Sequence, residues 1–352
     1  MSVQLEMTRK LGGFCLDVKL NTDQKRIGIL GASGSGKSMT LKCIAGIENP
    51  DQGRIVIDER VLFDSQSRCR PVPQKRKVGY LFQNYALFPN MNVAQNILCA
   101  VKKTKAEKEA LLEKMLDRFQ LKGLENRLPS ELSGGQQQRT ALARMMASEP
   151  SVILLDEPFS ALDVYLKDQL EHELHQMLED FPGTVIMVSH NRDEIYRFCD
   201  ALLILDQGKT VCFGKTKELF QNPEYTQAAR LTGCKNIAAV QRVNDSSYYA
   251  PDWDVIFFSH GNRAEKVDAV GIRAHQLIPV WDEKEGQVLL PVHHWYMEQL
   301  PFERKYYFYT SDKCRTPICW FVQKDLWPIL DEKGFPAGFQ IREEDLLLLK
   351  DE

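Results

Sequence analysis

The stretch from Gly31 to Ser38 constrains the fold of this chain more than any other. It reads Gly-Ala-Ser-Gly-Ser-Gly-Lys-Ser and fits the pattern G-x-x-x-x-G-K-[ST]. An apolar segment with strand character, residues 26–30, precedes it, and a helix-forming segment, residues 38–45, follows it. Glycines let backbone N–H groups turn toward an anion, and the start of a helix adds a partial positive charge. The sequence therefore predicts a loop that holds nucleotide phosphates between a strand and a helix.

Two side chains at the end of this loop have specific expected roles. Lys37 is placed to reach the outer phosphates, and the hydroxyl of Ser38 to hold Mg²⁺. The alternative is an ordinary turn with a solvated lysine, because a motif this short also occurs by chance. The predicted nucleotide contacts in this segment are Gly31, Ala32, Ser33, Gly34, Ser35, Gly36, Lys37, Ser38 and Met39.

Size and charge limit the class of protein. A chain of 352 residues exceeds one ordinary core, so we expect two domains. The net charge of −3 lacks the basic excess of nucleic-acid binders, and we expect no nucleic-acid partner. No apolar run approaches the ~18 residues of a membrane span, and the N-terminus lacks the apolar segment of a secretion signal. Nine cysteines without a C-x-x-C pair indicate reduced thiols rather than a disulfide framework.

Two residues near predicted strands are candidates for ligand contact. Alternating apolar residues across 3–20, with a glycine pair at 12–13, predict a hairpin that contains Phe14. Phe14 is either a ring that stacks on adenine or a core residue of a half-buried strand, and the pattern leaves both open. The strand at 78–82 ends at Gln83, which could reach a metal ion or an attacking water; a merely solvated glutamine is the alternative.

Residues 92–148 read as helical, and they contain the segment Leu-Ser-Gly-Gly-Gln-Gln-Gln-Arg. We expect a helix from Thr140 to Met146 after this segment, and Ser133 is a suitable N-cap. The glycine pair that follows Ser133 would let a ligand approach the backbone, which predicts a second anion site. An ordinary capped helix start would explain the serine but not the paired glycines.

Two carboxylates follow the four apolar residues of 152–155. This run predicts a buried parallel strand, whose carboxyl end is where open α/β sheets place ligands. Asp156 is expected to hold Mg²⁺, and Glu157 to polarise a water that attacks the γ-phosphate. Another buried strand, 184–188, leads to His190, which could sense the γ-phosphate. Between the two strands, residues 160–163 are expected to cap a long helix that ends near residue 180.

Taken in order, the motifs GASGSGKS, Gln83, LSGGQQQR, LLDEP, SALD and SH resemble those of the ATP-binding-cassette ATPases. The resemblance covers residues 1–231 and implies an α/β P-loop ABC ATPase domain with a helical subdomain at about 90–148. It implies ATP and Mg²⁺ as cofactors and a head-to-tail homodimer with two ATP molecules between the copies. The catalytic residues implied are Glu157, His190 and Gln83; the Mg²⁺ ligands are Ser38, Gln83 and Asp156; further ATP contacts are Phe14, Ser133, Gly134, Gly135, Gln136 and Asp163.

Residues 84–93 are similar to the segment of importer cassettes that docks a short helix of a membrane permease. The permease would be a separate chain, because no membrane span is predicted here. The resemblance also implies an extracytoplasmic substrate-binding protein that acts through the permease. We therefore expect a peripheral protein on the cytoplasmic face of the cell membrane.

The remainder, residues 232–352, is rich in short β-type segments and predicts a small C-terminal β-barrel. The resemblance to importer cassettes implies that this barrel is of the TOBE/MOP-like kind. The aromatics in these segments favour core packing over a base-stacking surface, because lysine and arginine clusters are absent. The expected strands are 255–258, 269–273, 287–290, 306–309 and 318–322.

Residues 231–236 and 270–275 resemble segments of the accessory domain of oxyanion importers, with the molybdate/tungstate type first and sulfate next. Thr232, Lys235 and Asn236 offer a hydroxyl, an ammonium and an amide to a tetrahedral anion. A linker that only packs the two domains together is the alternative.

The function expected from these resemblances is ATP hydrolysis that drives import of a small oxyanion, molybdate or tungstate, through a separate permease. Importers of sulfate, iron, sugar or polyamine stay open, because proteins outside this chain select the substrate. A non-transport cassette protein is a further alternative, although such proteins usually carry two cassettes or a long coiled-coil insertion, and this chain has neither.

Overall fold

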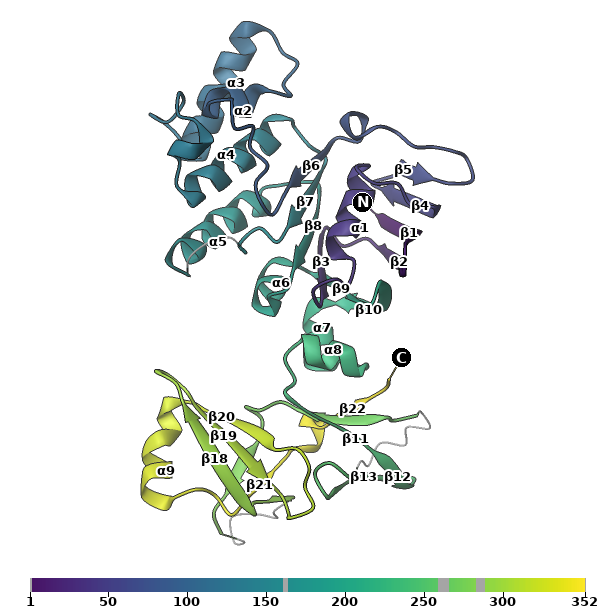
Figure 1. Ribbon diagram of the computed structural model, residues 1–352, viewed down its shortest axis with the longest axis vertical. Coiled ribbons are helices and arrows are strands. Elements are labelled where there is room, and N and C mark those ends of the chain that lie inside the picture. The colour runs from purple at the N-terminus through teal and green to yellow at the C-terminus, as the bar shows by residue number, and fades with distance from the viewer. Residues whose placement is uncertain (1, 161–163, 259–265, 283–288, 352) are drawn as a thin grey trace. The chain divides into compact units, whose positions relative to one another are not determined.

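The computed structural model describes residues 2–160, 164–258, 266–282 and 289–351. The chain divides into two compact units, Met1–Lys217 and Glu218–Glu352, each with its own sheets (Figure 1). The predicted domain boundary between residues 231 and 232 lies inside the second of these units, and it stays a prediction.

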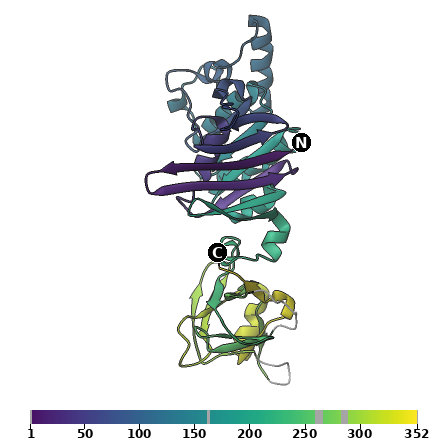
Figure 2. The same ribbon diagram turned by 90° about the vertical axis from the view of Figure 1, so that its right-hand side faces the viewer.

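The first unit is built on a ten-stranded sheet in the order β5-β4-β1-β2-β10-β9-β3-β8-β7-β6. The half from β9 to β6 is parallel, and the β5-β4-β1-β2 strands pair antiparallel. Figure 2 shows the long strands β1 and β2 side by side. The strands are β1 (Val3–Leu11), β2 (Phe14–Thr22), β3 (Arg26–Gly31), β4 (Gln52–Ile57), β5 (Arg60–Asp64), β6 (Val78–Leu81), β7 (Val152–Asp156), β8 (Thr184–Ser189), β9 (Ala201–Asp206) and β10 (Lys209–Lys215).

The parallel half brings the predicted site residues to one edge of the sheet. Every residue of β7 and β8 is buried, as expected for strands covered on both faces. Parallel neighbours end at the same edge, so the carboxyl ends of β3, β6, β7 and β8 lie together. The phosphate loop follows β3, Gln83 follows β6, Asp156 ends β7 and His190 follows β8. This is the edge at which open α/β sheets bind ligands.

Helices surround the sheet, and three of them, α2, α3 and α4, gather in one group, the predicted helical subdomain (Figure 1). Each of these three begins with a capping box, in which the N-cap side chain and the third helical residue exchange hydrogen bonds. The helices of this unit are α1 (Lys37–Ala45), α2 (Val93–Leu98), α3 (Lys105–Arg118), α4 (Gly134–Ala147), α5 (Val164–Glu179) and α6 (Arg192–Phe198); α7 (Thr216–Gln221) spans the division between the units.

The predicted start of α4 is wrong. The helix begins at Gly134 rather than at Thr140, so the glycine pair forms its first turn. The Ser133 hydroxyl accepts a hydrogen bond from the Gln136 backbone N–H, and the Gln136 side chain accepts one from the Ser133 N–H. This reciprocal cap satisfies two N–H groups of the first turn, which offsets the low helix propensity of glycine.

The second unit is β-rich, as predicted, but its described strands form four three-stranded antiparallel sheets rather than one continuous barrel sheet. The strands expected at 255–258, 269–273, 306–309 and 318–322 are present. Of the strand expected at 287–290, residues 287 and 288 lie outside the described part. The elements are α8 (Thr226–Leu231), β11 (Asn236–Ala239), β12 (Gln241–Asn244), β13 (Ser247–Ala250), β14 (Val255–Phe258), β15 (Ala269–Ile272), β16 (Ile278–Val280), β17 (Leu290–Pro291), β18 (His294–Gln299), β19 (Arg304–Tyr309), β20 (Ile318–Val322), α9 (Trp327–Lys333), β21 (Gly338–Gln340) and β22 (Leu347–Leu349).

The core of the second unit is largely aromatic. Trp253, Phe257, Phe308, Trp320 and Phe339 are all at most 1% exposed. Their rings contact one another, for example Phe308 with Phe339 at 4.5 Å between centroids. These contacts agree with core packing as the role expected for the aromatic residues.

Candidate functional site

The phosphate loop has a backbone that only glycine permits at two positions. A Cβ on Gly31 would lie 2.4 Å from the carbonyl oxygen of Leu205 and 2.4 Å from the hydroxyl of Ser35. Gly36 has a φ of +99°, and a Cβ there would lie 2.6 Å from Leu16. Among the described residues, the buried hydroxyl of Ser35 has no hydrogen-bond partner. The loop therefore offers an unused buried donor and a helix start to an anion.

Lys37 is buried at the base of this loop, with 6% of its surface exposed. Its Nζ donates hydrogen bonds to the carbonyl oxygens of Gly31 and Ala32, each at 3.0 Å. Burial lowers the pKa of Lys37, and the nearby charges of Glu157 and Asp156 act in the opposite direction. An ammonium has three donors, so one remains for a phosphate, whose charge would offset the desolvation of the lysine.

Asp156 connects the phosphate loop to the end of β7. Its Oδ1 accepts a hydrogen bond from the Ser38 hydroxyl at 2.8 Å, and its Oδ2 accepts one from the Tyr80 hydroxyl at 2.9 Å. Burial raises the pKa of Tyr80, and the Asp156 charge raises it further, so Tyr80 is a donor at neutral pH. The residues predicted to hold Mg²⁺ thus include two that already touch.

The oxygen groups of Ser38, Asp156 and Gln83 fit the preference of Mg²⁺ for hard ligands. Within the described part of the chain, no cluster of three or more His, Cys, Asp or Glu side chains could hold a metal ion. Mg²⁺ does not require such a cluster, because it is usually bound by one or two carboxylates, substrate phosphates and water. The donor set is therefore compatible with Mg²⁺ that arrives with a nucleotide.

Glu157 is the point at which the three predicted catalytic side chains meet. Its Oε2 lies 3.2 Å from Nε2 of Gln83 and 3.3 Å from Nδ1 of His190. Its backbone has a φ of +48°, which is rare for a residue with a side chain. The backbone N–H of Glu157 donates to the Val188 carbonyl, and its own carbonyl accepts from the N–H and hydroxyl of Ser160. These bonds hold the left-handed turn that follows β7.

A buried charge network that the sequence analysis missed lies beneath His190. The Ser189 hydroxyl donates to Oε2 of Glu194 at 2.5 Å and accepts from the Asn191 N–H at 2.9 Å. Oε1 of Glu194, which is 3% exposed, pairs with Nζ of Lys167 at 2.6 Å. The network fixes the residues on both sides of His190 and ties α6 to α5. No motif in the sequence indicates the ion pair between Lys167 and Glu194, because these two residues lie on separate helices, α5 and α6.

The second predicted anion site lies at the start of α4. Ser133 and Gly134 are exposed, Gln136 is half-buried and Gly135 is buried. No hydrogen bond or ion pair between described residues joins this segment to the phosphate loop of the same chain. Asp163, predicted to contact ATP, lies outside the described residues.

The surroundings of Phe14 are compatible with both of its expected roles, core packing and stacking on adenine. It is half-buried and packs against the core of the first unit. The Phe14 ring also lies next to Gly36 of the phosphate loop and next to Gly208, since a Cβ on these glycines would be 3.2 Å and 2.9 Å from the ring. Stacking of this ring on adenine stays a prediction.

The predicted permease-docking segment, residues 84–93, exposes apolar side chains on a fixed backbone. Phe88 is 47% exposed and Met91 is 36% exposed. The fully buried amide of Asn96 donates to the carbonyl oxygens of both residues and accepts from the Phe88 N–H. Arg144 donates to the carbonyl oxygens of Tyr85 and Ala86, and its guanidinium lies over the Phe88 ring. These hydrogen bonds fix the backbone that carries the exposed side chains of Phe88 and Met91.

The three residues predicted to hold an oxyanion have different surroundings. The hydroxyl of Thr232 is buried and donates to carbonyl oxygens at the end of α8. The side chain of Asn236 is buried and pairs with both the N–H and the carbonyl of Cys319. Lys235 is exposed. Two of the three side chains thus have partners within the protein, and the oxyanion site stays a prediction.

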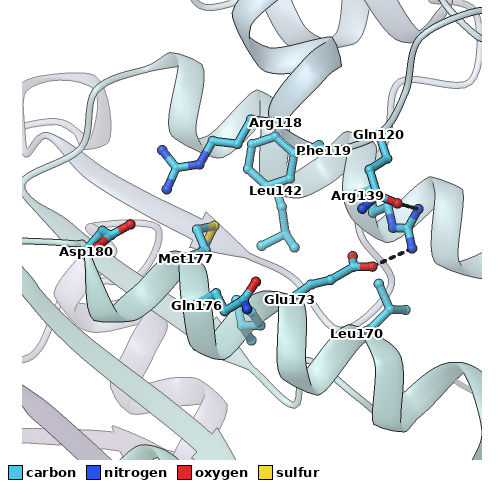
Figure 3. A pocket seen from close by; sticks show the side chains of 11 residues that line it. Arg118, Phe119, Gln120, Arg139, Leu142, Leu170, Glu173, Gln176, Met177 and Asp180 are labelled. Atoms are coloured by element: carbon cyan, nitrogen blue, oxygen red, sulfur yellow. Dashed lines mark hydrogen bonds and ion pairs between the residues drawn. The ribbon is translucent and has the colours of Figure 1, made fainter.

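A cavity of about 190 Å³ lies apart from all these residues, between α5, α4 and the end of α3 (Figure 3). Figure 3 shows Arg139 directed toward both Gln120 and Glu173, with the ion pair to Glu173 at 2.7 Å. None of the predicted site residues lines the cavity. It is a feature of the helix packing rather than of the nucleotide site.

The parallel sheet, the glycine-constrained loop and the carboxylates at its edge define a phosphate-loop nucleotide-binding domain. Comparison with known proteins narrows the class, because residues 16–160 match the family model described as "ABC transporter". The chain is also 36% identical over 242 residues to the probable sulfate/thiosulfate import ATP-binding protein of Chlorella vulgaris, covering 67% of this chain and 100% of that protein. The chain belongs to the ATP-binding proteins of the ABC transporter family.

Two further comparisons concern length and fold. The molybdenum import ATP-binding protein of Paramagnetospirillum magneticum is 36% identical over 222 residues, which is 63% of this chain but only 61% of that protein. Among solved structures, the dimeric post-hydrolysis state of the ATP-binding cassette MJ0796 bound to ADP and Pi matches with a TM-score of 0.52 and 27% identity. It covers 61% of this chain and 99% of that chain. Among the described helices, none combines the length and apolar composition that crossing a membrane requires.

Proposed function

We propose that this chain is the ATP-hydrolysing subunit of an importer for a small oxyanion, molybdate or tungstate, and that it acts through separate permease chains. The observation that carries the catalytic part is the meeting of Gln83 and His190 at one oxygen of Glu157, next to the contact between Asp156 and Ser38. The carboxylates, the amide and the imidazole of these residues thus gather at the edge of the sheet where the phosphate loop ends.

The chain's own residues perform three tasks in this proposal. The loop N–H groups and Lys37 hold the phosphates and stabilise the charge that builds up between the β- and γ-phosphates. Glu157 accepts a proton from the attacking water while the water oxygen bonds to the γ-phosphorus. The bond between the γ-phosphorus and the β–γ bridging oxygen breaks in the same step. Gln83 and His190 orient the Glu157 carboxylate and the water. Mg²⁺, held through Ser38, Asp156 and Gln83, would neutralise phosphate charge when bound.

We propose that the complete site forms between two copies of the chain. The start of α4, from Ser133 to Gln136, in which Ser133 and Gly134 are exposed, would then face the γ-phosphate held by Lys37 of the other copy. Two arguments support this. Among the described residues, no hydrogen bond or ion pair joins the start of α4 to the phosphate loop of its own chain, and the related cassette MJ0796 is dimeric with ADP and Pi. Asp163 and Met39 are further proposed contacts of the nucleotide.

We propose that residues 84–93 bind the permease and so place the protein at the membrane surface. The exposed Phe88 and Met91, held by Asn96, support a docking surface for an apolar helix face. The substrate-binding protein would act through the permease. Molybdate as substrate is supported by the molybdenum import relative, and sulfate is equally supported, since both relatives are 36% identical.

The proposed hydrolysis is tested with purified Glu157→Gln protein. Gln keeps the shape without the basicity, so ATP turnover should fall by about 10²–10⁴-fold while ATP affinity, measured by calorimetry, is retained. Glu149→Gln makes the same change at an exposed ion pair and should leave turnover unchanged. Turnover by Glu157→Gln at the wild-type rate would exclude Glu157 as the base.

The proposed substrate is tested in cells that lack this chain and are supplied with wild-type or Glu157→Gln protein. Accumulated molybdenum and tungsten are measured by mass spectrometry, and sulfate uptake with labelled sulfate. Restoration of molybdenum uptake by wild type alone supports the proposal, whereas restoration of sulfate uptake alone would replace molybdate with sulfate.

A further inference from the structure

The hydroxyl of Tyr80 has no part in the roles described so far, yet it contacts a central residue of the site. It donates to Oδ2 of Asp156 at 2.9 Å, while Oδ1 of the same carboxylate accepts from Ser38 at 2.8 Å. Asp156 is only 5% exposed. Water is therefore largely excluded, and each oxygen of this carboxylate depends on a side-chain donor.

The position of the Tyr80 hydroxyl is itself fixed. The Tyr80 ring stacks on Phe82 at 4.2 Å between centroids and packs against the hydrophobic core of the first unit. Tyr80 lies on β6, which pairs in parallel with β7 so that Tyr80 is opposite Leu154. The donor thus comes from the neighbouring strand rather than from the phosphate loop, and its place does not depend on the loop.

We propose that Tyr80 is a positioning residue for Mg²⁺, because it holds the Asp156 carboxylate in the rotation that presents Oδ1 to Ser38. This inference rests on the proposed function, in which Ser38 and Asp156 hold the metal ion. Without the Tyr80 hydroxyl, Oδ2 becomes a buried acceptor without a donor, and the carboxylate is free to turn away from Ser38. Partners that orient metal-binding groups in this way typically change metal affinity by 10–100-fold.

The experiment compares Tyr80→Phe with Tyr85→Phe in the full chain. Both changes remove one phenolic hydroxyl; the Tyr85 hydroxyl is also buried, but among the described residues it has no hydrogen-bond partner. Free Mn²⁺ is measured by electron paramagnetic resonance while Mn²⁺ is titrated into protein saturated with ADP. ADP affinity in EDTA is measured by calorimetry as a metal-independent control.

We expect Tyr80→Phe to weaken Mn²⁺ binding about 10-fold and to leave ADP affinity in EDTA unchanged, while Tyr85→Phe changes neither by more than about 2-fold. Wild-type Mn²⁺ affinity in Tyr80→Phe, or an equal loss in both variants, would overturn the inference. If Tyr80→Phe does not fold, Tyr80→Met tests the same loss with a flexible side chain. Wild-type protein that binds ADP but no Mn²⁺ would instead refute the proposed metal site.

Discussion

Replacing Glu194 with Gln tests whether the buried network beneath His190 stabilises the first unit. The substitution keeps the side-chain shape and an acceptor for Ser189 but removes the charge that pairs with Lys167 at 2.6 Å. Lys167 is 25% exposed, and its other partner, Glu171, is more distant at 3.7 Å. The ammonium is therefore left partly buried with a weaker ion pair.

Breaking a buried pair by removing one partner costs about 3–5 kcal/mol. Because Lys167 keeps some contact with water, we take the lower end, about 3 kcal/mol. At about 2–4 °C per kcal/mol for a domain of the length of Met1–Lys217, the melting temperature of the first unit should fall by about 6–12 °C.

The assay can separate the two units, because all five tryptophans lie in the second one, between Trp253 and Trp327. Calorimetry and far-UV circular dichroism report both units, whereas tryptophan fluorescence reports the second unit alone, whose transition should not move. Asp117→Asn is the matched control, since Asp117 and its partner Lys122 are 71% and 60% exposed. An exposed pair contributes less than about 1 kcal/mol.

At about 2–4 °C per kcal/mol, a melting temperature of Glu194→Gln within about 2 °C of that of Asp117→Asn corresponds to no more than about 1 kcal/mol. That result would refute the claim that the buried ion pair stabilises the first unit. It would mean that Ser189 and Asn191 hold the segment around His190 without the charge. A fluorescence transition that falls by the same number of degrees would mean that the two units unfold together, and the shift would then be assigned to the whole chain.

Three further predictions concern the start of α4, the segment at residues 84–93 and the cysteines. Ser133→Arg should block hydrolysis but not ATP binding to the monomer, and mixing it with Lys37→Ala should restore at most one competent site per heterodimer; hydrolysis assays of the mixture check this. Asn96→Ala should lower the melting temperature by removing an amide that bonds several backbone groups, and limited proteolysis should then cut between residues 84 and 91. At pH 8, iodoacetamide should label the exposed Cys99 but not Cys43, whose pKa burial raises to about 11; mass spectrometry of native and unfolded protein checks this.

The first unit was predictable because its signals are local. The glycine-rich loop, the apolar runs of β7 and β8, and the carboxylates after β7 each occupy a short continuous segment. Their convergence follows from one rule, that parallel strands end at a common edge. The start of α4 was misjudged because glycine has low helix propensity, and the prediction did not weigh the reciprocal cap of Ser133 and Gln136.

The contacts that could not be predicted from the sequence join residues that are distant in the chain. Tyr80 and Asp156 are neighbours only because β6 and β7 pair, and Lys167 and Glu194 only because two helices lie against each other. The strands of the second unit are three or four residues long in most cases, with weak alternation, so β11, β12 and β13 were not predicted. The hydroxyl of Thr232, by contrast, bonds to carbonyl oxygens only three and four residues earlier, a local contact that the sequence analysis did not consider.

The left-handed backbone of Glu157 has a consequence for how this chain can change over generations. A residue with a side chain at a φ of +48° costs about 1–3 kcal/mol, and glycine would relieve most of that cost. A substitution that increases stability at this position therefore removes the carboxylate that accepts the proton. The substitution Glu157→Gly would remove only two side-chain contacts, those with Gln83 and His190, and would give a more stable but inactive protein. Only a requirement for ATP turnover disfavours it.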